Sequence, residues 1–217
     1  MRKDLTELVF ILDRSGSMYP LVSDTIGGFN GVLEENRKLP GECRVTTILF
    51  NDEFMTLHDH LPIRGIANLT EKDYRPGGST ALLDAVGQAI EKLDGIQEHT
   101  IESERAEKVQ FVIITDGFEN ASTKFNLQRV RRMISARKEQ GWDFLFLGAN
   151  MDAVSVAGTM GIHADRAVEM MSDGIGTSKG YEAVSRANIS FRTGCAEAPR
   201  AWKAEVEEDT RRRKPHK

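Results

Sequence analysis

Two segments of the sequence place oxygen-bearing side chains directly after apolar runs. In "LVFILDRSGSM", the run ends at Asp13, and Ser15 and Ser17 follow at alternate positions. In "QFVIITDG", a second run ends at Asp116. Carboxylate and hydroxyl oxygens suit a hard divalent cation such as Mg2+, and a cation relieves the repulsion between two neighbouring carboxylates. These residues therefore predict a metal-binding crevice, provided that the fold brings the two segments together.

A glycine-rich segment, "RPGGSTALLDA", supplies further hydroxyls. Ser79 and Thr80 lie just before a helical pattern, where a hydroxyl would otherwise cap the helix. In D-x-S-x-S, three side chains point the same way if the turn stays extended, and Gly16 lets the backbone bend between the serines. Taken singly, each of these residues is more often an ordinary turn or capping residue. The prediction depends on the three segments meeting in space.

The elements that must position these residues alternate between strands and helices. Apolar runs rich in β-forming residues predict strands over 5–13, 44–50, 107–117, 142–150 and 165–170, and a turn at Asn51-Asp52 pairs 44–50 with an extended edge segment over 53–63. Apolar residues at helical spacing predict helices over 22–33, 82–93, 127–134, 153–160 and about 178–196, with "MSDGIGTSKG" as the loop before the last. We expect an α/β fold: a doubly wound, mostly parallel six-stranded sheet with one antiparallel edge strand and helices on both faces, Rossmann-like.

In open sheets of this kind, ligands bind beyond the carboxyl ends of the strands, where the strand order reverses. Asp13 and Asp116 both follow the carboxyl ends of buried strands. If those two strands are neighbours at the reversal, both aspartates face one crevice.

Composition and charge exclude several classes of protein. The 217 residues suffice for one domain, and no apolar stretch is long enough to span a bilayer. The start of the chain resembles no secretory signal, and two distant cysteines indicate no disulfide framework, so we expect a cytoplasmic protein. The last seven residues carry five Lys or Arg; without them, the formal net charge of −4 becomes −9. An acidic body argues against nucleic acid as the main partner. We expect a domain over 1–200 and a charged tail over 201–217, whose last seven residues are solvated.

The three segments together resemble a von Willebrand factor type A domain with a complete metal-ion-dependent adhesion site (MIDAS). The pattern of that family is D-x-S-x-S after the first strand, a threonine before a helix, and T-D-G after the fourth strand. The matching positions are Asp13, Ser15, Ser17, Thr80 and Asp116. The resemblance covers residues 5–195. The segments "LDRSGSM…GGFN…GSTALLDA…IITDGFENAS" are similar to those of stand-alone bacterial members.

The resemblance implies roles for these residues and for their neighbours. In the family, the serines coordinate the metal directly, the threonine does so directly or through water, and the aspartates act largely through water or as acceptors behind the ligands. A coordination position stays open for an Asp or Glu of a protein partner. The resemblance thus implies a metal-dependent adaptor that uses Mg2+, with Mn2+ or Ca2+ as alternatives. Relatives work with AAA+ ATPases and stress-response complexes. We expect the partner-binding rim to comprise Tyr19, Gly78, Ser79, Glu119 and Asn120.

Two alternatives remain at this stage. A Mg2+-dependent hydrolase would need a base or nucleophile, but no histidine falls in the three motif loops, and neither H-E-x-x-H nor G-x-S-x-G occurs. A small-ligand or nucleotide binder would use the same crevice, but no G-x-G-x-x-G follows the first strand and no P-loop motif occurs. The sequence leaves the oligomeric state open.

Overall fold

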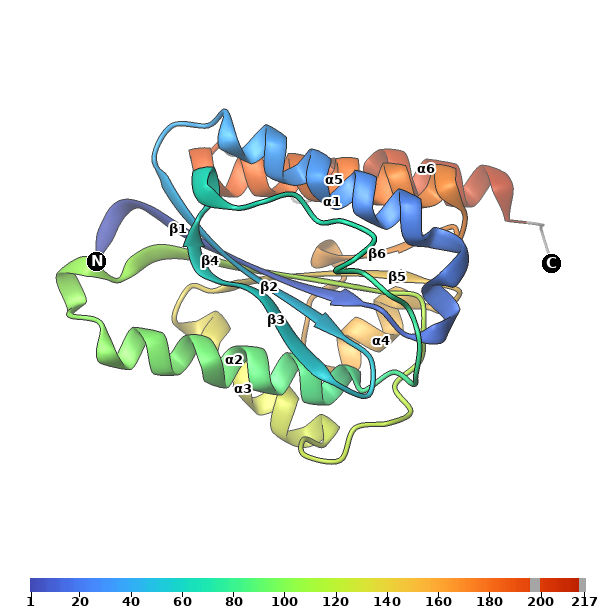
Figure 1. The fold of residues 1–217 in the computed structure, drawn as a ribbon, viewed down its shortest axis with the longest axis horizontal. Coiled ribbons are helices and arrows are strands. Elements are labelled where there is room, and N and C mark those ends of the chain that lie inside the picture. Colours follow the sequence, from blue (N-terminus) through green and yellow to red (C-terminus); the bar gives the residue numbers. More distant parts are fainter. Residues whose placement is uncertain (196–199, 215–217) are drawn as a thin grey trace.

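A computed structural model of the chain describes residues 1–195 and 200–214. Within these residues, one sheet has the strand order β3-β2-β1-β4-β5-β6 (Figure 1). Only β3 is antiparallel to its neighbour. The predicted six-stranded, doubly wound α/β fold is confirmed. The strands are β1 (Arg2–Asp13), β2 (Glu42–Phe50), β3 (Phe54–Pro62), β4 (Ala106–Thr115), β5 (Asp143–Ala149) and β6 (Ala167–Met170).

Helices cover both faces of the sheet (Figure 1). One face carries α1 (Val22–Arg37), α5 (Gly174–Thr193) and α6 (Ala204–Arg213). The other face carries α2 (Leu82–His99), α3 (Leu127–Glu139) and α4 (Ala153–Thr159). Among the described residues, no helix combines the length and apolar character needed to cross a membrane.

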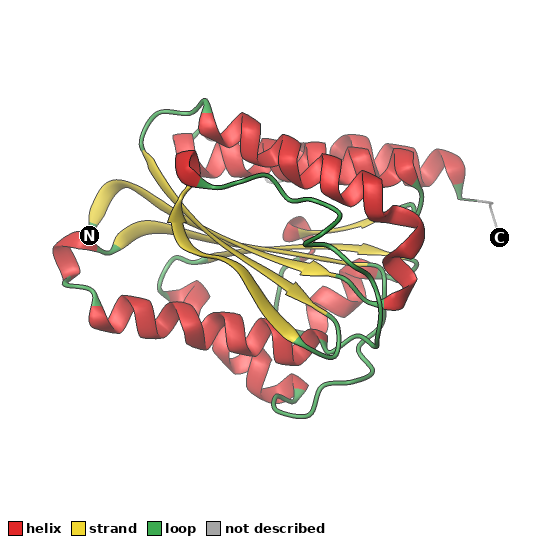
Figure 2. Cartoon of the chain, in the orientation of Figure 1, coloured by secondary structure: helices red, strands yellow, loops and turns green. Residues whose placement is uncertain are grey.

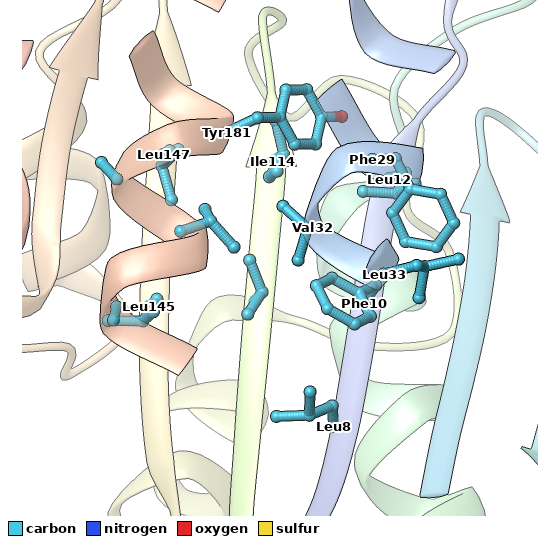
Figure 3. Packing of buried hydrophobic residues seen from close by; sticks show 14 of the residues in the cluster. Leu8, Phe10, Leu12, Phe29, Val32, Leu33, Ile114, Leu145, Leu147 and Tyr181 are labelled. Carbon is cyan, nitrogen blue, oxygen red and sulfur yellow. The ribbon is translucent and has the colours of Figure 1, made fainter. Parts of the chain in front are cut away.

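The central strand β1 is apolar on both sides because both of its faces are covered. Leu8, Phe10 and Leu12 pack under α1 and α5, while Val9 and Ile11 pack against the opposite helices. Figure 3 shows Phe10 beside Phe29 of α1; their rings meet edge to face, with centroids 5.2 Å apart. The unbroken apolar run before Asp13 follows from this two-sided burial.

The order of the strands puts a reversal at the centre of the sheet. From β1 the chain moves outward through β2 to the edge strand β3, and then returns to the other side of β1 as β4. Figure 2 shows the arrowheads of the parallel strands pointing toward one edge. The loops after β1 and β4 therefore leave this edge in opposite directions, which opens a crevice between them.

The helix predicted over about 178–196 begins earlier in the structure. Residues 174–177 were expected to be loop, but α5 starts at Gly174. Asp173 caps it by accepting a hydrogen bond from the Gly176 amide over 2.9 Å. A side chain at Gly176 would lie 2.2 Å from the Met171 carbonyl oxygen, and one at Gly180 would lie 2.6 Å from Met170 Sδ. The glycines that suggested a loop are instead required by close packing.

The predicted domain boundary at residue 200 is wrong, because residues 201–210 dock on the sheet, while Arg211, Arg212 and Lys214 are exposed. Trp202 and Lys203 are buried, and α6 packs on β6 and α5. The Lys203 ammonium donates to the Ala167 carbonyl over 2.8 Å, and the Thr210 hydroxyl donates to the Glu169 carbonyl over 3.0 Å. These bonds satisfy carbonyls of the edge strand β6 that would otherwise be open to pairing. Residues 215–217 lie outside the described part of the chain.

The C-terminal segment should therefore contribute to stability. Trp202 is 3% exposed, and its indole nitrogen donates to the Asp165 carbonyl over 2.9 Å. We expect Trp202→Ala to lower the free energy of unfolding by about 3–5 kcal/mol, as for other buried aromatic truncations. Urea unfolding measures this loss. Glu205→Ala, which removes a largely exposed partner of Arg186, serves as the control and should change stability by less than about 1 kcal/mol. If both substitutions lowered the free energy of unfolding by the same small amount, docking of this segment would not contribute to stability.

Candidate functional site

The loops after β1 and β4 meet at the reversal. The two strands pair in parallel through Leu12 and Ile114, so their following loops begin side by side. The Ser17 hydroxyl donates to Asp116 Oδ1 over 2.6 Å, and the hydroxyl oxygens of Ser15 and Ser17 are 3.1 Å apart. The structure thus brings the first and third predicted segments together.

Asp13 holds the turn after β1. It is 1% exposed; its Oδ1 accepts a hydrogen bond from the Ser15 amide over 2.7 Å, and its Oδ2 accepts one from the Thr115 hydroxyl over 2.5 Å. The Tyr74 hydroxyl donates to the Asp13 carbonyl. Burial raises the pKa of Asp13 to about 6, against the lowering effect of these hydrogen bonds. Asp13 therefore joins the two strand ends and fixes the direction of the serine-bearing turn.

Asp116 carries an oxygen that the protein leaves unpaired. Its Oδ1 accepts the bond from Ser17, but its Oδ2 is buried and has no hydrogen-bond partner among the described residues. Burial raises the pKa of Asp116. A buried carboxylate oxygen without a partner is costly, and a bound cation would remove that cost.

Thr80 lies against the same loop. A side chain on Gly117 would lie 2.8 Å from Thr80 Oγ1 and 3.6 Å from Ser17 Oγ, so both hydroxyls border the space beside Gly117. Asn120 holds Thr80 from both sides: its side chain accepts from the Thr80 amide over 2.9 Å, and its amide donates to the Thr80 carbonyl over 3.0 Å. All five predicted metal-site residues therefore surround one place at the sheet edge.

The glycines before α2 let their loop lie on the turn after β1. Gly78 has φ +72°, in the region that favours glycine, and its carbonyl accepts from the Gly16 amide over 3.1 Å. A side chain at Gly78 would collide with Asp52, whose carboxylate accepts from the Ser79 amide over 3.2 Å. Gly78 and Ser79 are both exposed. Asp52 is a turn residue that helps to position this loop. The sequence analysis did not predict this role.

The remaining predicted rim residues differ in their exposure to solvent and in their hydrogen bonds. Tyr19 is 70% exposed and Asn120 is also exposed. Glu119 is only half-exposed, and its carboxylate accepts bonds from the Leu83 amide and from the amide and hydroxyl of Ser122. Glu119 thus closes its own loop onto the start of α2, a positioning role that the sequence analysis did not predict.

Asp84 anchors the same loop from inside α2. Its carboxylate accepts hydrogen bonds from the amides of Thr123, Lys124 and Phe125 over 2.7–2.9 Å. Asp84 is 7% exposed, between apolar helix positions that face the sheet. In the sequence, this role was indicated only by an acidic residue at a helix position that is otherwise apolar, within the segment "GGSTALLDA".

The donor set fits a hard divalent cation. It combines two carboxylates with three hydroxyls, and one carboxylate oxygen lacks a partner among the residues that the structure describes. In the described part of the chain, no cluster of three or more His, Cys, Asp or Glu could hold a metal. A metal at this edge therefore depends on the serine and threonine hydroxyls.

The sequence matches no protein-family model and no curated protein. The fold, by contrast, matches solved structures. The vWF domain of the type V pili tip protein Mfa5 from Porphyromonas gingivalis is 9% identical over 88% of this chain and 97% of that chain, with a TM-score of 0.59. The chain has the von Willebrand factor type A fold.

Two further type A structures were solved with metal. Proximal thread matrix protein 1 from the mussel byssus, with a zinc-occupied MIDAS motif, is 16% identical over 84% of this chain and 45% of that chain, with a TM-score of 0.57. Manganese-loaded TRAP from Plasmodium vivax is 15% identical over 81% of this chain and 71% of that chain, with a TM-score of 0.55. The present chain spans less than half the length of the mussel protein.

The Asp84 anchor can be tested by stability. Asp84→Ala leaves three amides without their acceptor, so we expect the free energy of unfolding to fall by about 2–4 kcal/mol. Asp94→Ala is the matched control, because Asp94 lies on the same helix but pairs with Arg137 near the surface; about 1 kcal/mol or less is expected. Urea unfolding of both variants gives the comparison. A loss for Asp84→Ala no larger than that of the control would exclude the anchor.

Proposed function

We propose that the chain binds Mg2+ at the carboxyl edge of the sheet and uses the metal to hold an Asp or Glu of a protein partner. The observation that carries this proposal is the buried Asp116 Oδ2, which has no hydrogen-bond partner in the described part of the chain and lies beside the linked hydroxyls of Ser15 and Ser17. The residues that would hold the metal, directly or through water, are Asp13, Ser15, Ser17, Thr80 and Asp116.

The donor chemistry explains why the metal would attract a carboxylate. Hydroxyl ligands are neutral, and the Asp13 carboxylate is already engaged by the Ser15 amide and the Thr115 hydroxyl. A cation held mainly by neutral oxygens keeps most of its charge and attracts an incoming carboxylate strongly. The zinc and manganese in the two related structures support a divalent metal at such a site. Mg2+ is our choice for this chain, with Mn2+ and Ca2+ as alternatives.

We infer a binding role rather than catalysis. The loops over 13–21, 75–81 and 115–126 contain no histidine or cysteine to serve as base or nucleophile. The similarity to a pilus tip protein and a byssus matrix protein supports a protein partner. We propose a cytoplasmic adaptor, because Cys43 and Cys195 are both free. AAA+ ATPases and stress-response complexes are the partners to look for first.

Calorimetry with Mg2+ tests the metal site. The Ser17 hydroxyl bonds Ser15 and Asp116, so Ser17→Ala should reduce Mg2+ affinity at least about tenfold. The loss of its hydrogen bond to the buried Asp116 should also lower the melting temperature in EDTA slightly. Ser79→Ala is the matched control, because Ser79 is an exposed hydroxyl next to Thr80 that makes no side-chain hydrogen bond among those found in the described residues. Mg2+ should also raise the melting temperature of the wild type. Equal Mg2+ affinities of Ser17→Ala and the wild type would refute the assignment.

A pull-down with the purified chain tests the partner. We expect a protein that is retained in Mg2+, released by EDTA and absent with Asp116→Ala, because the metal forms the bridge. Alanine substitution of single exposed Asp or Glu residues of that protein should identify one whose loss abolishes binding. Retention that is the same in Mg2+ and EDTA would mean that the metal does not mediate the contact.

A further inference from the structure

A groove runs between α1 and α5, away from the candidate metal site. It encloses about 450 Å3. Its lining includes glycines of α1 and polar residues of α5 that recur at a spacing of one helical turn: Gly27, Gly31, Ser178 and Glu182. Because an α-helix rises about 1.5 Å per residue, the stretch of α1 from Gly27 to Glu35 makes the groove about 12 Å long. About two turns of another helix would fill it.

Two of the glycines leave the groove open. Gly28 allows close packing of the two helices, because a side chain there would lie 2.3 Å from the ring of Tyr181. At Gly27 and Gly31, by contrast, a side chain would meet no described group within 4 Å. Glycine destabilises a helix relative to alanine, and packing inside the chain does not account for these two positions. Their effect is a floor of bare backbone that another element can approach closely.

A buried hydroxyl lines the groove without a partner. Ser185 follows Tyr181 by one turn of α5 and lines the groove. It is 9% exposed, and its hydroxyl oxygen has no hydrogen-bond partner among the described residues. A buried polar group without a partner costs free energy, and a polar group brought in by a bound molecule would remove that cost. This hydroxyl is therefore a second sign, independent of the glycines, that the groove binds another molecule.

The rim of the groove is acidic. Three exposed carboxylates and one basic side chain line it: Glu34, Glu35, Glu182 and Arg186. Glu34 and Glu35 form exposed pairs with basic residues one turn further along α1, and such pairs contribute little. The Glu182 carboxylate accepts a hydrogen bond from the Ser178 hydroxyl over 3.2 Å and pairs with no basic side chain in the described part of the chain. The groove therefore favours a partner that carries positive charge.

The outer face of α3 has the complementary character. Arg131 and Arg132 are exposed there and form no ion pair within the residues that the structure describes. The two other arginines of α3 pair with acids of α2. One turn after Arg131 and Arg132, the same face presents the small side chains of Ser135 and Ala136. Small side chains let a helix lie close to a glycine floor, and the two free guanidinium groups can reach an acidic rim.

We propose that α3 of one copy of the chain docks in the groove between α1 and α5 of another copy, with Arg131 and Arg132 against the acidic rim. Ser135 and Ala136 then lie over Gly31. Figure 1 shows α3 and α1 on opposite sides of the sheet, so the contact joins two different surfaces, head to tail. Each added copy leaves one groove and one α3 free, and the contact can repeat along a row of copies. Neither surface includes a residue of the candidate metal site, which stays open in every copy.

Sedimentation equilibrium of the full chain tests this contact. We expect the average mass of the wild type to rise with protein concentration beyond the mass of a dimer, because a head-to-tail contact does not end at two copies. Added salt should weaken the association, because it screens the attraction between the arginines and the carboxylates. The association should be the same in Mg2+ and in EDTA, since it does not involve the candidate metal site.

Two variants block one surface each. Gly31→Gln fills the groove and should preserve the fold, because the space there is open and glutamine favours a helix more than glycine does. Arg132→Glu places a negative charge against the acidic rim. Each variant alone should associate at least about tenfold more weakly than the wild type. An equimolar mixture should form a dimer and stop there, because the intact groove of the Arg132→Glu chain accepts the intact α3 of the Gly31→Gln chain.

Gly95→Gln and Lys3→Glu are the matched controls. Gly95 lies in α2, where a side chain would also meet no described group within 4 Å, and it lines neither surface. Lys3 is an exposed cation near the start of β1. Both controls should associate as the wild type does.

Three outcomes would overturn the proposal. The first is a wild-type chain that stays monomeric at every concentration. The second is association of the wild type without complementation, in which the mixture of Gly31→Gln and Arg132→Glu associates no better than either variant alone. The third is association that requires Mg2+, because a carboxylate of one copy would then be held by the metal of another.

Discussion

The buried carboxylate of Asp13 joins the ends of the two central strands, and the geometry of the site depends on it. One oxygen accepts the Ser15 amide and the other accepts the Thr115 hydroxyl, so the turn after β1 and the end of β4 are held by one group. The strand order makes this bond possible, because β1 and β4 are neighbours although about a hundred residues separate them. Ser17 reaches Asp116, and Ser15 reaches Ser17, only because this turn is fixed.

That arrangement reduces stability when no cation is present. Burial raises the pKa of Asp13 from 3.8 to about 6, and it raises the pKa of Asp116 as well. A carboxyl group whose pKa is higher in the folded state binds more protons when folded, so its contribution to stability falls as the pH rises from about 4 to about 6. At neutral pH, two charged carboxylates therefore lie buried near each other at a cost that a divalent cation would offset. The surrounding loops tolerate that cost because Asp84, Glu119 and Asn120 fix their backbones independently.

The sequence predicted the parts that depend on local pattern and missed those that depend on distant contacts. The turn at Asn51 correctly indicated the antiparallel edge hairpin, and the three motif segments do meet. The strand order itself was left as a condition, because the pairing of β1 with β4 depends on contacts between distant segments. The early start of α5 was missed because its glycines suggested a loop, whereas they pack against Met170 and Met171. The roles of Asp84 and Glu119 were missed because their hydrogen bonds join α2 to a loop nearly forty residues away. The metal itself stays a prediction.

The C-terminal segment belongs to the folded domain. Its charged composition suggested a tail outside the domain, yet Trp202 and Lys203 dock it and Thr210 satisfies an open carbonyl of β6. Docking also brings Lys214 to β6, where it pairs with Glu169. The same segment thus protects the exposed edge of the sheet. A chain ending at residue 200 would lose this protection, so the folded unit extends beyond the boundary that the composition suggested.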